Sequence, residues 1–277
     1  MVKIGLCQMK VLSCSKKDNI EKAKNMIVQA ADKGADIVVL PEMFNCPYDI
    51  KNFREYAEAE YCYGDTLKML SCISREKKIL LIGGSIPELD RKENVYNTSF
   101  VFNKDGNLIG KHRKMHLFDI DIKDSITFKE SKVLTPGNKI TIIDTKWGKI
   151  GIAICYDIRF PELIRLMALN GAKIVFIPAA FNMTTGPAHW ELLFRSRAVD
   201  NQIYIAGISP ARDINYSYVA YGHSLVVNPW GTITDILDEK EGILISELDL
   251  DYINDIRESL PVIKNRRKDI YDLTLLH

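Results

Sequence analysis

One cysteine, Cys155, lies where a short apolar segment gives way to a polar one that leads into a predicted helix. The preceding segment 149–154 is mostly apolar, which predicts a short strand buried on both faces. Pro161 is typical of the first turn of a helix. A thiol between such a strand and helix is well placed to be a nucleophile, because unpaired backbone N–H groups and the helix N-terminus favour a thiolate and an oxyanion. The alternative is a buried structural cysteine, the usual state of a free cysteine.

A glutamate, Glu42, ends the second predicted strand of the first half of the chain, whereas Cys155 ends the first strand of the second half. The stretch 34–45, GADIVVLPEMFN, matches 171–182, GAKIVFIPAAFN, at more than half of its positions, and KIGL at 3–6 precedes the first as KIGI at 149–152 precedes the second. Each half therefore follows the same pattern of strand, helix, strand and loop. Ligands bind beyond the carboxyl ends of strands in open α/β sheets, so we expect Glu42 and Cys155 to face one cleft.

Between the two halves lies an unusually basic segment, GKHRKMHLF at 110–118, which contains Lys114. It follows a predicted strand. A solvated basic loop is the commoner role of such a run. Its place between Glu42 and Cys155 in the chain makes Lys114 the third residue of interest.

The elements that would position these side chains follow from apolar periodicity and turn residues. Helices are predicted at 15–34, 65–77 (with Asp65 as N-cap), 161–170, 189–201 and 250–258, and a loop with a short helix at 45–63. Strands are predicted at 3–9, 35–40, 79–85, 95–103, 108–111, 140–143, 149–154, 173–177, 203–209, 221–228, 232–236 and 243–247. The segment 111–130 is predicted to be polar and irregular. Strand–helix–strand units predict parallel strands in two pseudo-two-fold-related α/β layers, with the helices outside.

Composition narrows the class of protein. The chain has 277 residues, 47% of them hydrophobic, with no low-complexity linker, so we expect a single domain over 1–277. Its net charge of +1 argues against a nucleic-acid or acidic-membrane partner, and no apolar run is long enough to span a bilayer. The N-terminus lacks the long apolar region of a signal peptide. The six cysteines form no C-x-x-C pair, which favours free thiols in a reducing cytoplasm; they are Cys7, Cys14, Cys46, Cys62, Cys72 and Cys155.

Three motifs together resemble a known signature. LPE ending at Glu42, HRK ending at Lys114 and CYDIRFPE starting at Cys155 are similar, in order and type, to the signature of the nitrilase superfamily of carbon–nitrogen hydrolases. The resemblance implies a four-layer α-β-β-α sandwich, a Glu-Lys-Cys triad, no cofactor and a homodimer built through helices that flank the nucleophile. The stretches HLFDID, ITFKES, TGPAHWELL and RSRAVDNQ further resemble the omega-amidase branch, which deamidates 2-oxoglutaramate and 2-oxosuccinamate.

The chemistry of amide hydrolysis gives each matched residue a role. Cys155 is the expected nucleophile and Glu42 its base, while Lys114 and the backbone N–H of Tyr156 are expected to stabilise the oxyanion. The resemblance assigns Glu130 to orienting Lys114 and the substrate; an ordinary surface glutamate is the alternative.

An acid substrate also requires a group that binds its carboxylate. Arg159 is a candidate for two-point binding of that group, or else a structural ion pair with Glu162 or a neighbour. Arg195 and Arg197 are expected to be structural. Tyr48 either contacts the substrate or is a plain loop residue.

Several other functions stay open at this stage. A Cys-His protease would need a histidine base, but nothing around Cys155 resembles those proteases. His112 and His116 have the spacing of a zinc pair without a third ligand, and Gly83-Gly84 lacks the spacing of a dinucleotide-binding loop. Among the amidases, hydrolysis of an N-carbamoyl compound or of deaminated glutathione is the alternative. A catalytically silent scaffold of the same fold is the non-enzyme alternative.

Overall fold

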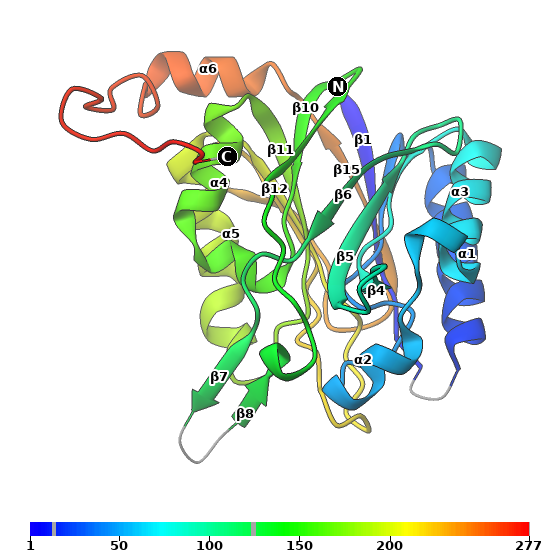
Figure 1. The fold of residues 1–277 in the computed structure, drawn as a ribbon. Helices are drawn as coiled ribbons and strands as arrows, with labels where there is room; N and C mark the ends of the chain where they lie inside the picture. Colours follow the sequence, from blue (N-terminus) through cyan, green and yellow to red (C-terminus); the bar gives the residue numbers. More distant parts are fainter. Residues whose placement is uncertain (13–14, 123–125, 277) are drawn as a thin grey trace.

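Two β-sheets packed face to face form the middle of the molecule, and helices cover the outer face of each sheet (Figure 1). The computed structural model describes residues 1–12, 15–122 and 126–276. The side chains of Ile4, Leu6 and Val39 from one sheet and of Ile152 and Phe176 from the other belong to one buried cluster between the sheets. This is the predicted four-layer α-β-β-α sandwich.

The first sheet has the strand order β15-β1-β2-β3-β5-β4, with β6 paired to β5. Strands β1 to β3 are mutually parallel and the other pairings are antiparallel. Helices α1 (Lys16–Asp32) and α3 (Asp65–Lys77) pack on its outer face. The strands are β1 (Val2–Gln8), β2 (Ile37–Val39), β3 (Leu80–Ile82), β4 (Ile86–Leu89), β5 (Val95–Phe102), β6 (Leu108–Arg113) and β15 (Gly242–Leu248).

The second sheet has the order β14-β13-β12-β11-β10-β9 and parallel pairing among β10, β11 and β12. Helices α4 (Pro161–Leu169) and α5 (Gly186–Asn201) cover its outer face. The strands are β9 (Thr141–Thr145), β10 (Gly148–Ile152), β11 (Ala172–Pro178), β12 (Tyr204–Ile208), β13 (Leu225–Val227) and β14 (Ile233–Ile236). Three parallel strands with two helices on one face thus occur in both halves, which confirms the internal symmetry.

Smaller elements surround the ends of the sheets. Helix α2 (Ile50–Tyr56) follows β2, and α6 (Tyr252–Ser259) follows β15. The hairpin of β7 (Asp119–Ile122) and β8 (Ile126–Lys129) projects beyond the sandwich (Figure 1). Short 3-10 helices occupy 60–62, 130–132 and 155–159. Within the part of the chain that the structure describes, no helix is long and apolar enough to cross a membrane.

Most predicted elements are confirmed, and three details differ. Segment 111–130 is not irregular: it contains the end of β6 and the β7–β8 hairpin. Strand β4 was not predicted, because Pro87 lies within it. Asp65 is not the N-cap of α3: Gly64 occupies that position, and the Glu58 carboxylate accepts from the N–H of Thr66 instead, at 3.1 and 3.2 Å.

The cysteines agree with the prediction of free thiols wherever the structure describes them. Cys7, Cys46, Cys62, Cys72 and Cys155 are unpaired, and Cys14 lies outside the described residues.

Candidate active site

Cys155 begins the 3-10 turn that follows β10, and its backbone is strained. Its φ of +46° lies in the left-handed region, which costs a non-glycine residue of the order of 1–3 kcal/mol. The turn is held by Asp157, whose N–H donates to the Ile154 carbonyl at 3.0 Å and whose Oδ2 accepts from the Ile154 N–H at 3.0 Å. Helix α4 begins only at Pro161, so Cys155 is not in its first turn, and the predicted support from the α-helix N-terminus is absent.

Glu42 follows the carboxyl end of β2, and its side chain is 1% exposed. Oε1 accepts from Asn97 Nδ2 at 2.8 Å and from Lys114 Nζ at 3.0 Å, and Oε2 accepts from the Ala180 N–H at 2.8 Å. Burial raises the pKa of the Glu42 carboxyl above its ordinary value; the Lys114 ammonium opposes this effect and the Glu130 charge adds to it. A buried carboxylate with a raised pKa is suited to accepting and returning a proton.

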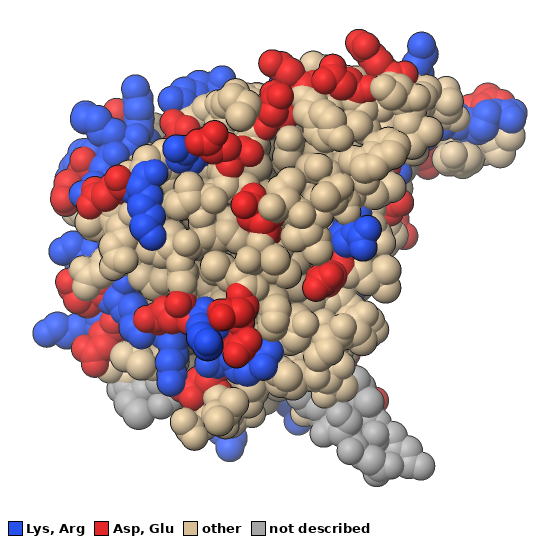
Figure 2. Space-filling model, turned by 180° about the vertical axis from the view of Figure 1, so that it is seen from behind, with Lys and Arg blue, Asp and Glu red and all other residues tan. Residues whose placement is uncertain are grey.

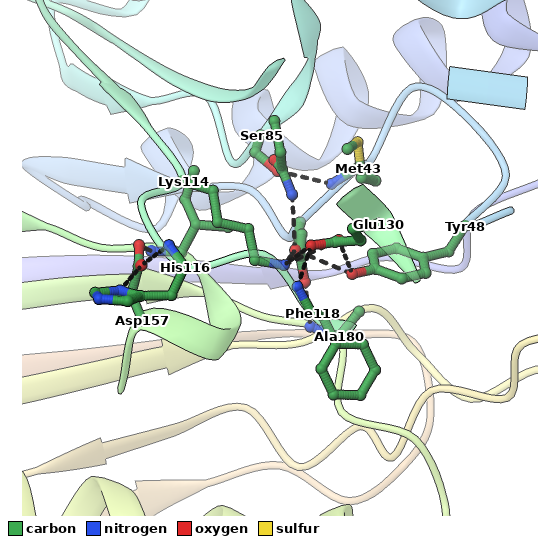
Figure 3. Close-up of polar contacts among 12 residues, drawn as sticks. Met43, Tyr48, Ser85, Lys114, His116, Phe118, Glu130, Asp157 and Ala180 are labelled. Carbon is green, nitrogen blue, oxygen red and sulfur yellow. Dashed lines mark hydrogen bonds and ion pairs between the residues drawn. The ribbon is translucent and has the colours of Figure 1, made fainter. Parts of the chain in front are cut away.

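Lys114 lies directly after β6 and is fully buried between two carboxylates (Figure 3). Its Nζ is 3.0 Å from Glu42 Oε1 and 2.9–3.0 Å from both oxygens of Glu130. Its own N–H donates to the Asn97 carbonyl at 2.8 Å. Burial alone would lower the pKa of Lys114, but the charges of Glu130 and Glu42 outweigh it and hold the pKa above its usual value. Lys114 is therefore a fixed cation.

Glu130 is fully buried, which rules out the surface glutamate considered above. Its Oε2 accepts from the Phe118 N–H at 2.7 Å and its Oε1 from the Tyr48 hydroxyl at 2.8 Å. The same hydroxyl lies 3.3 Å from Glu42 Oε1, so Tyr48 contacts both carboxylates (Figure 3). Tyr48 is thus not a plain loop residue.

The thiol of Cys155 is not a preformed thiolate. Burial raises its pKa well above the usual value and the Glu42 charge raises it further, while Lys114 and a hydrogen bond from the Ala180 N–H act in the opposite direction. The Glu42 carboxylate and the Cys155 thiol act on each other's pKa values, so a candidate base lies close to the proton it must remove. The arrangement can perform covalent catalysis through a cysteine activated at the moment of attack.

Arg159 and Tyr156 lie on the wall beside this cluster. The Arg159 guanidinium carbon is 5.0 Å from the Phe181 ring centroid and 5.6 Å from that of Tyr156. Burial and the charges of Cys155 and Glu42 raise the pKa of the Tyr218 hydroxyl, whereas the Arg159 charge lowers it. Among the described residues Arg159 has no acidic partner, so the alternative of an ion pair with Glu162 or a neighbour is not seen. The Tyr156 N–H lies in the first turn of the 3-10 helix, where N–H groups lack an intrahelical partner.

Two residues that hold the cluster were missed by the sequence interpretation. Asn97 donates to Glu42 from strand β5, and its only signal was a run of three polar residues, Asn97 to Ser99, within a buried strand. Asp157 is fully buried and joins the nucleophile turn to the lysine segment (Figure 3). Its Oδ1 accepts from the N–H and Nδ1 of His116 at 2.9 and 2.8 Å, and its Oδ2 contacts His112 Nε2 at 3.0 Å.

The two histidines considered as a zinc pair therefore contact one carboxylate. No group of three metal-binding side chains occurs among the residues covered by the structure. A cavity of about 30 Å³ lies next to Glu42, with Tyr48, Ala180 and Tyr218 on its wall. A cavity of that volume has room for a water molecule.

Comparison with known proteins gives consistent matches over the whole chain. Residues 3–258 match the carbon–nitrogen hydrolase family. The chain is 50% identical to omega-amidase NIT2 of Homo sapiens over 269 residues, covering 97% of this chain and 96% of that protein. It is 52% identical to the chloroplastic omega-amidase of Arabidopsis thaliana over 275 residues, covering 98% and 73%. The crystal structure of Saccharomyces cerevisiae Nit3, a member of branch 10 of the nitrilase superfamily, matches with a TM-score of 0.89 and 47% identity over 96% of both chains.

Proposed function

This chain belongs to the carbon–nitrogen hydrolase family, and from that premise we propose that it hydrolyses the terminal amide of small 2-oxo acids. The substrates are 2-oxoglutaramate and 2-oxosuccinamate, and the products are the dicarboxylate and ammonia. One observation carries the choice of substrate: a guanidinium, that of Arg159, lies beside the reactive cluster with no acidic partner in the described part of the chain. The omega-amidases of Homo sapiens and Arabidopsis thaliana, about half identical to this chain, support the same activity.

The first half of the reaction forms a thioester. The Cys155 sulfur attacks the amide carbon while its proton passes to Glu42. The carbonyl oxygen becomes an oxyanion that the Lys114 ammonium and the Tyr156 N–H stabilise. When the carbon–nitrogen bond breaks, Glu42 returns the proton to the nitrogen and ammonia leaves. The Glu42 charge raises the pKa of the Cys155 thiol, which burial has already raised, and this proximity supports Glu42 as the group that takes and returns the proton.

The second half consumes one water molecule. Glu42 takes a proton from the water as its oxygen attacks the thioester carbon, and then returns the proton to sulfur as the carbon–sulfur bond breaks. The water-sized cavity beside Glu42 supports this role, because a water there is next to the base. The product carries a new carboxyl group and Cys155 is again a thiol.

Glu130 and Tyr48 act by positioning the reacting groups. Both Glu130 oxygens lie within 3.0 Å of Lys114 Nζ, so Glu130 fixes the ammonium that faces the oxyanion. Tyr48 holds Glu130 in turn. Arg159 binds the 2-oxo carboxylate through two parallel N–H···O bonds, which a guanidinium provides and an ammonium does not.

Ammonia release from a small panel of amides tests the proposal. We expect a kcat/KM for 2-oxoglutaramate at least about 100-fold above that for pentanamide, which has five carbons but no carboxylate. Equal values would reject the proposed substrates without affecting family membership. Carbon dioxide released with ammonia from an N-carbamoyl compound would favour the carbamoylase alternative. Cys155→Ala should abolish ammonia release, with Cys72→Ala, at an exposed thiol, as the matched control; activity in Cys155→Ala would reject the thioester.

Association into a homodimer through the α4 and α5 face is also part of the proposal. Charged side chains crowd the side of α1 and α3, whereas the side of α4 and α5 is mostly uncharged (Figure 2). On that side Leu192, Val199 and Trp230 are 61%, 43% and 55% exposed. Exposed apolar patches of this kind mark association surfaces. Light scattering should give twice the chain mass of 31.5 kDa, and Val199→Asp should lower it; a mass of one chain for the unaltered protein would reject the dimer.

We further propose a single domain in a reducing compartment such as the cytoplasm. The family match over 3–258 supports one domain. The five described cysteines, none in a disulfide, support a reducing environment.

A further inference from the structure

The Arg159 guanidinium is contacted by a histidine from a different element. His189 lies near the start of helix α5, and its Nδ1 is 3.3 Å from Nη1 and 3.4 Å from Nη2 of Arg159. A guanidinium can only donate hydrogen bonds, so Nδ1 is the acceptor for both N–H groups. The histidine is therefore neutral, with its proton on Nε2.

This contact decides which edge of the guanidinium is available. One acceptor shared by Nη1 and Nη2 uses the inner N–H of each, at the end of the Arg159 side chain. Of the five donors, Nε–H and the two outer N–H groups are left. Nε–H and the neighbouring outer N–H form a side edge that matches the two oxygens of a carboxylate.

The backbone of Arg159 is fixed by the same helix. Arg197 of α5 donates to the Ile158 carbonyl at 2.8 Å and to the Arg159 carbonyl at 3.3 Å. The rings of Phe181 and Tyr156 lie against the guanidinium. The main chain of Arg159 is thus held by α5, and His189 is the residue placed to set the rotation of the guanidinium about the side-chain axis.

We propose that His189 is a positioning residue that turns the side edge of Arg159 toward the substrate carboxylate and so sets the preference for acid amides over uncharged amides. The inference rests on the proposed function, because it requires a substrate with a carboxylate. Without the Nδ1 acceptor the guanidinium rotates, and two-point binding of the carboxylate becomes one-point binding. The loss of one charge-assisted hydrogen bond corresponds to roughly a ten-fold loss in binding.

The experiment compares two substrates in four proteins. His189→Ala removes the acceptor, and His189→Asn restores one, because the asparagine oxygen is two bonds from Cβ, as Nδ1 is. Glu191→Gln, at an exposed position two residues along α5, is the matched control. We expect His189→Ala to raise the KM for 2-oxoglutaramate about ten-fold with kcat changed less than two-fold, and to lower the ratio of its kcat/KM to that of pentanamide by the same factor. His189→Asn should recover most of that ratio.

A binding measurement gives the same result without turnover. The product 2-oxoglutarate carries the same carboxylate, so its inhibition constant should rise about ten-fold in His189→Ala and stay unchanged in Glu191→Gln. An unchanged substrate ratio and an unchanged inhibition constant in a folded His189→Ala protein would overturn the inference. If the unaltered protein shows no preference for 2-oxoglutaramate, the proposed function fails first; a preference that survives in His189→Ala refutes only the role of His189.

Discussion

Replacing Asp157 by asparagine should disturb both stability and catalysis, because this carboxylate accepts four hydrogen bonds in a fully buried position. Oδ1 accepts from the N–H and Nδ1 of His116, and Oδ2 from His112 Nε2 and the Ile154 N–H. The single side-chain oxygen of asparagine can accept the hydrogen bonds of only one of these two carboxylate oxygens, and its NH₂ group faces the donors of the other. A change of tautomer lets the histidine ring nitrogen accept from that NH₂ group, but the backbone N–H of either Ile154 or His116 loses its acceptor.

The magnitude follows from that count. A hydrogen bond to a charged group contributes about 1.5–3 kcal/mol, and the remaining bonds weaken when the charge is lost. We therefore expect Asp157→Asn to lower the free energy of unfolding by about 2–4 kcal/mol. The left-handed backbone of Cys155 is held by this carboxylate, and a misplacement of about 1 Å at a reacting atom costs about 100-fold in rate. The kcat should therefore fall about 100-fold in protein that is still folded.

Urea unfolding followed by circular dichroism measures the first effect, and ammonia release under conditions that keep the variant folded measures the second. Asp105→Asn, in the exposed β5–β6 turn, is the matched control. If both quantities for Asp157→Asn match those of Asp105→Asn, the carboxylate does not hold the nucleophile turn and the reasoning is wrong.

Three further predictions concern the buried carboxylates of Glu42, Glu130 and Glu88. Glu42→Gln should lower kcat by at least about 1000-fold because the base is lost. It should also lower the pKa of the Cys155 thiol, because a nearby negative charge is removed, and the pH midpoint of iodoacetamide alkylation should therefore fall. An unchanged or higher midpoint would contradict this electrostatic account. Tyr48→Phe should reduce kcat about ten-fold through Glu130, with a smaller effect on KM, and equal effects on both would argue for substrate contact instead. Glu88→Gln should cost about 2–3 kcal/mol of stability by removing the partner of Arg113 at 2.6–2.8 Å. Contacts of Glu88, chiefly with Arg113, hold its folded-state pKa below the unfolded value despite burial. That contribution to stability is therefore complete above about pH 4.3 and is lost as pH falls. The free energy of unfolding of Glu88→Gln should thus decrease less on acidification than that of the unaltered protein.

The sequence allowed the architecture to be predicted because it repeats itself. The matching segments around Glu42 and in β11 predicted two similar α/β units, and the resemblance pointed to Glu42, Lys114 and Cys155 as the proposed triad. Helix α3 was predicted with its correct bounds because its apolar spacing is regular. Hairpin β7–β8 was missed because its strands are only four residues long, contain polar residues and lie outside the large sheets.

The contacts that hold the site could not be predicted, because each joins residues far apart in the chain. Asn97 and Glu42 are 55 positions apart, and His116 and Asp157 are 41 apart. The local sequence around each residue contains nothing that specifies the other. His189 was noted only as part of a motif and as one of several histidines, and its contact with Arg159 depends on how α5 packs against the nucleophile turn.

The charge of the buried cluster links these contacts to the chemistry. Glu42 and Glu130 share one ammonium, that of Lys114, so the three groups together carry one negative charge in excess. Burial makes that excess costly, and a proton placed on Glu42 removes it. In the proposed reaction, attack by Cys155 supplies that proton, and departure of ammonia takes it away again. The oxygens of Glu130 are occupied by Lys114, the Phe118 N–H and the Tyr48 hydroxyl, whereas burial and the Glu130 charge raise the pKa of the Glu42 carboxyl, so we propose Glu42 as the carboxylate that takes up the proton. The second glutamate therefore raises the proton affinity of the first as well as fixing the lysine.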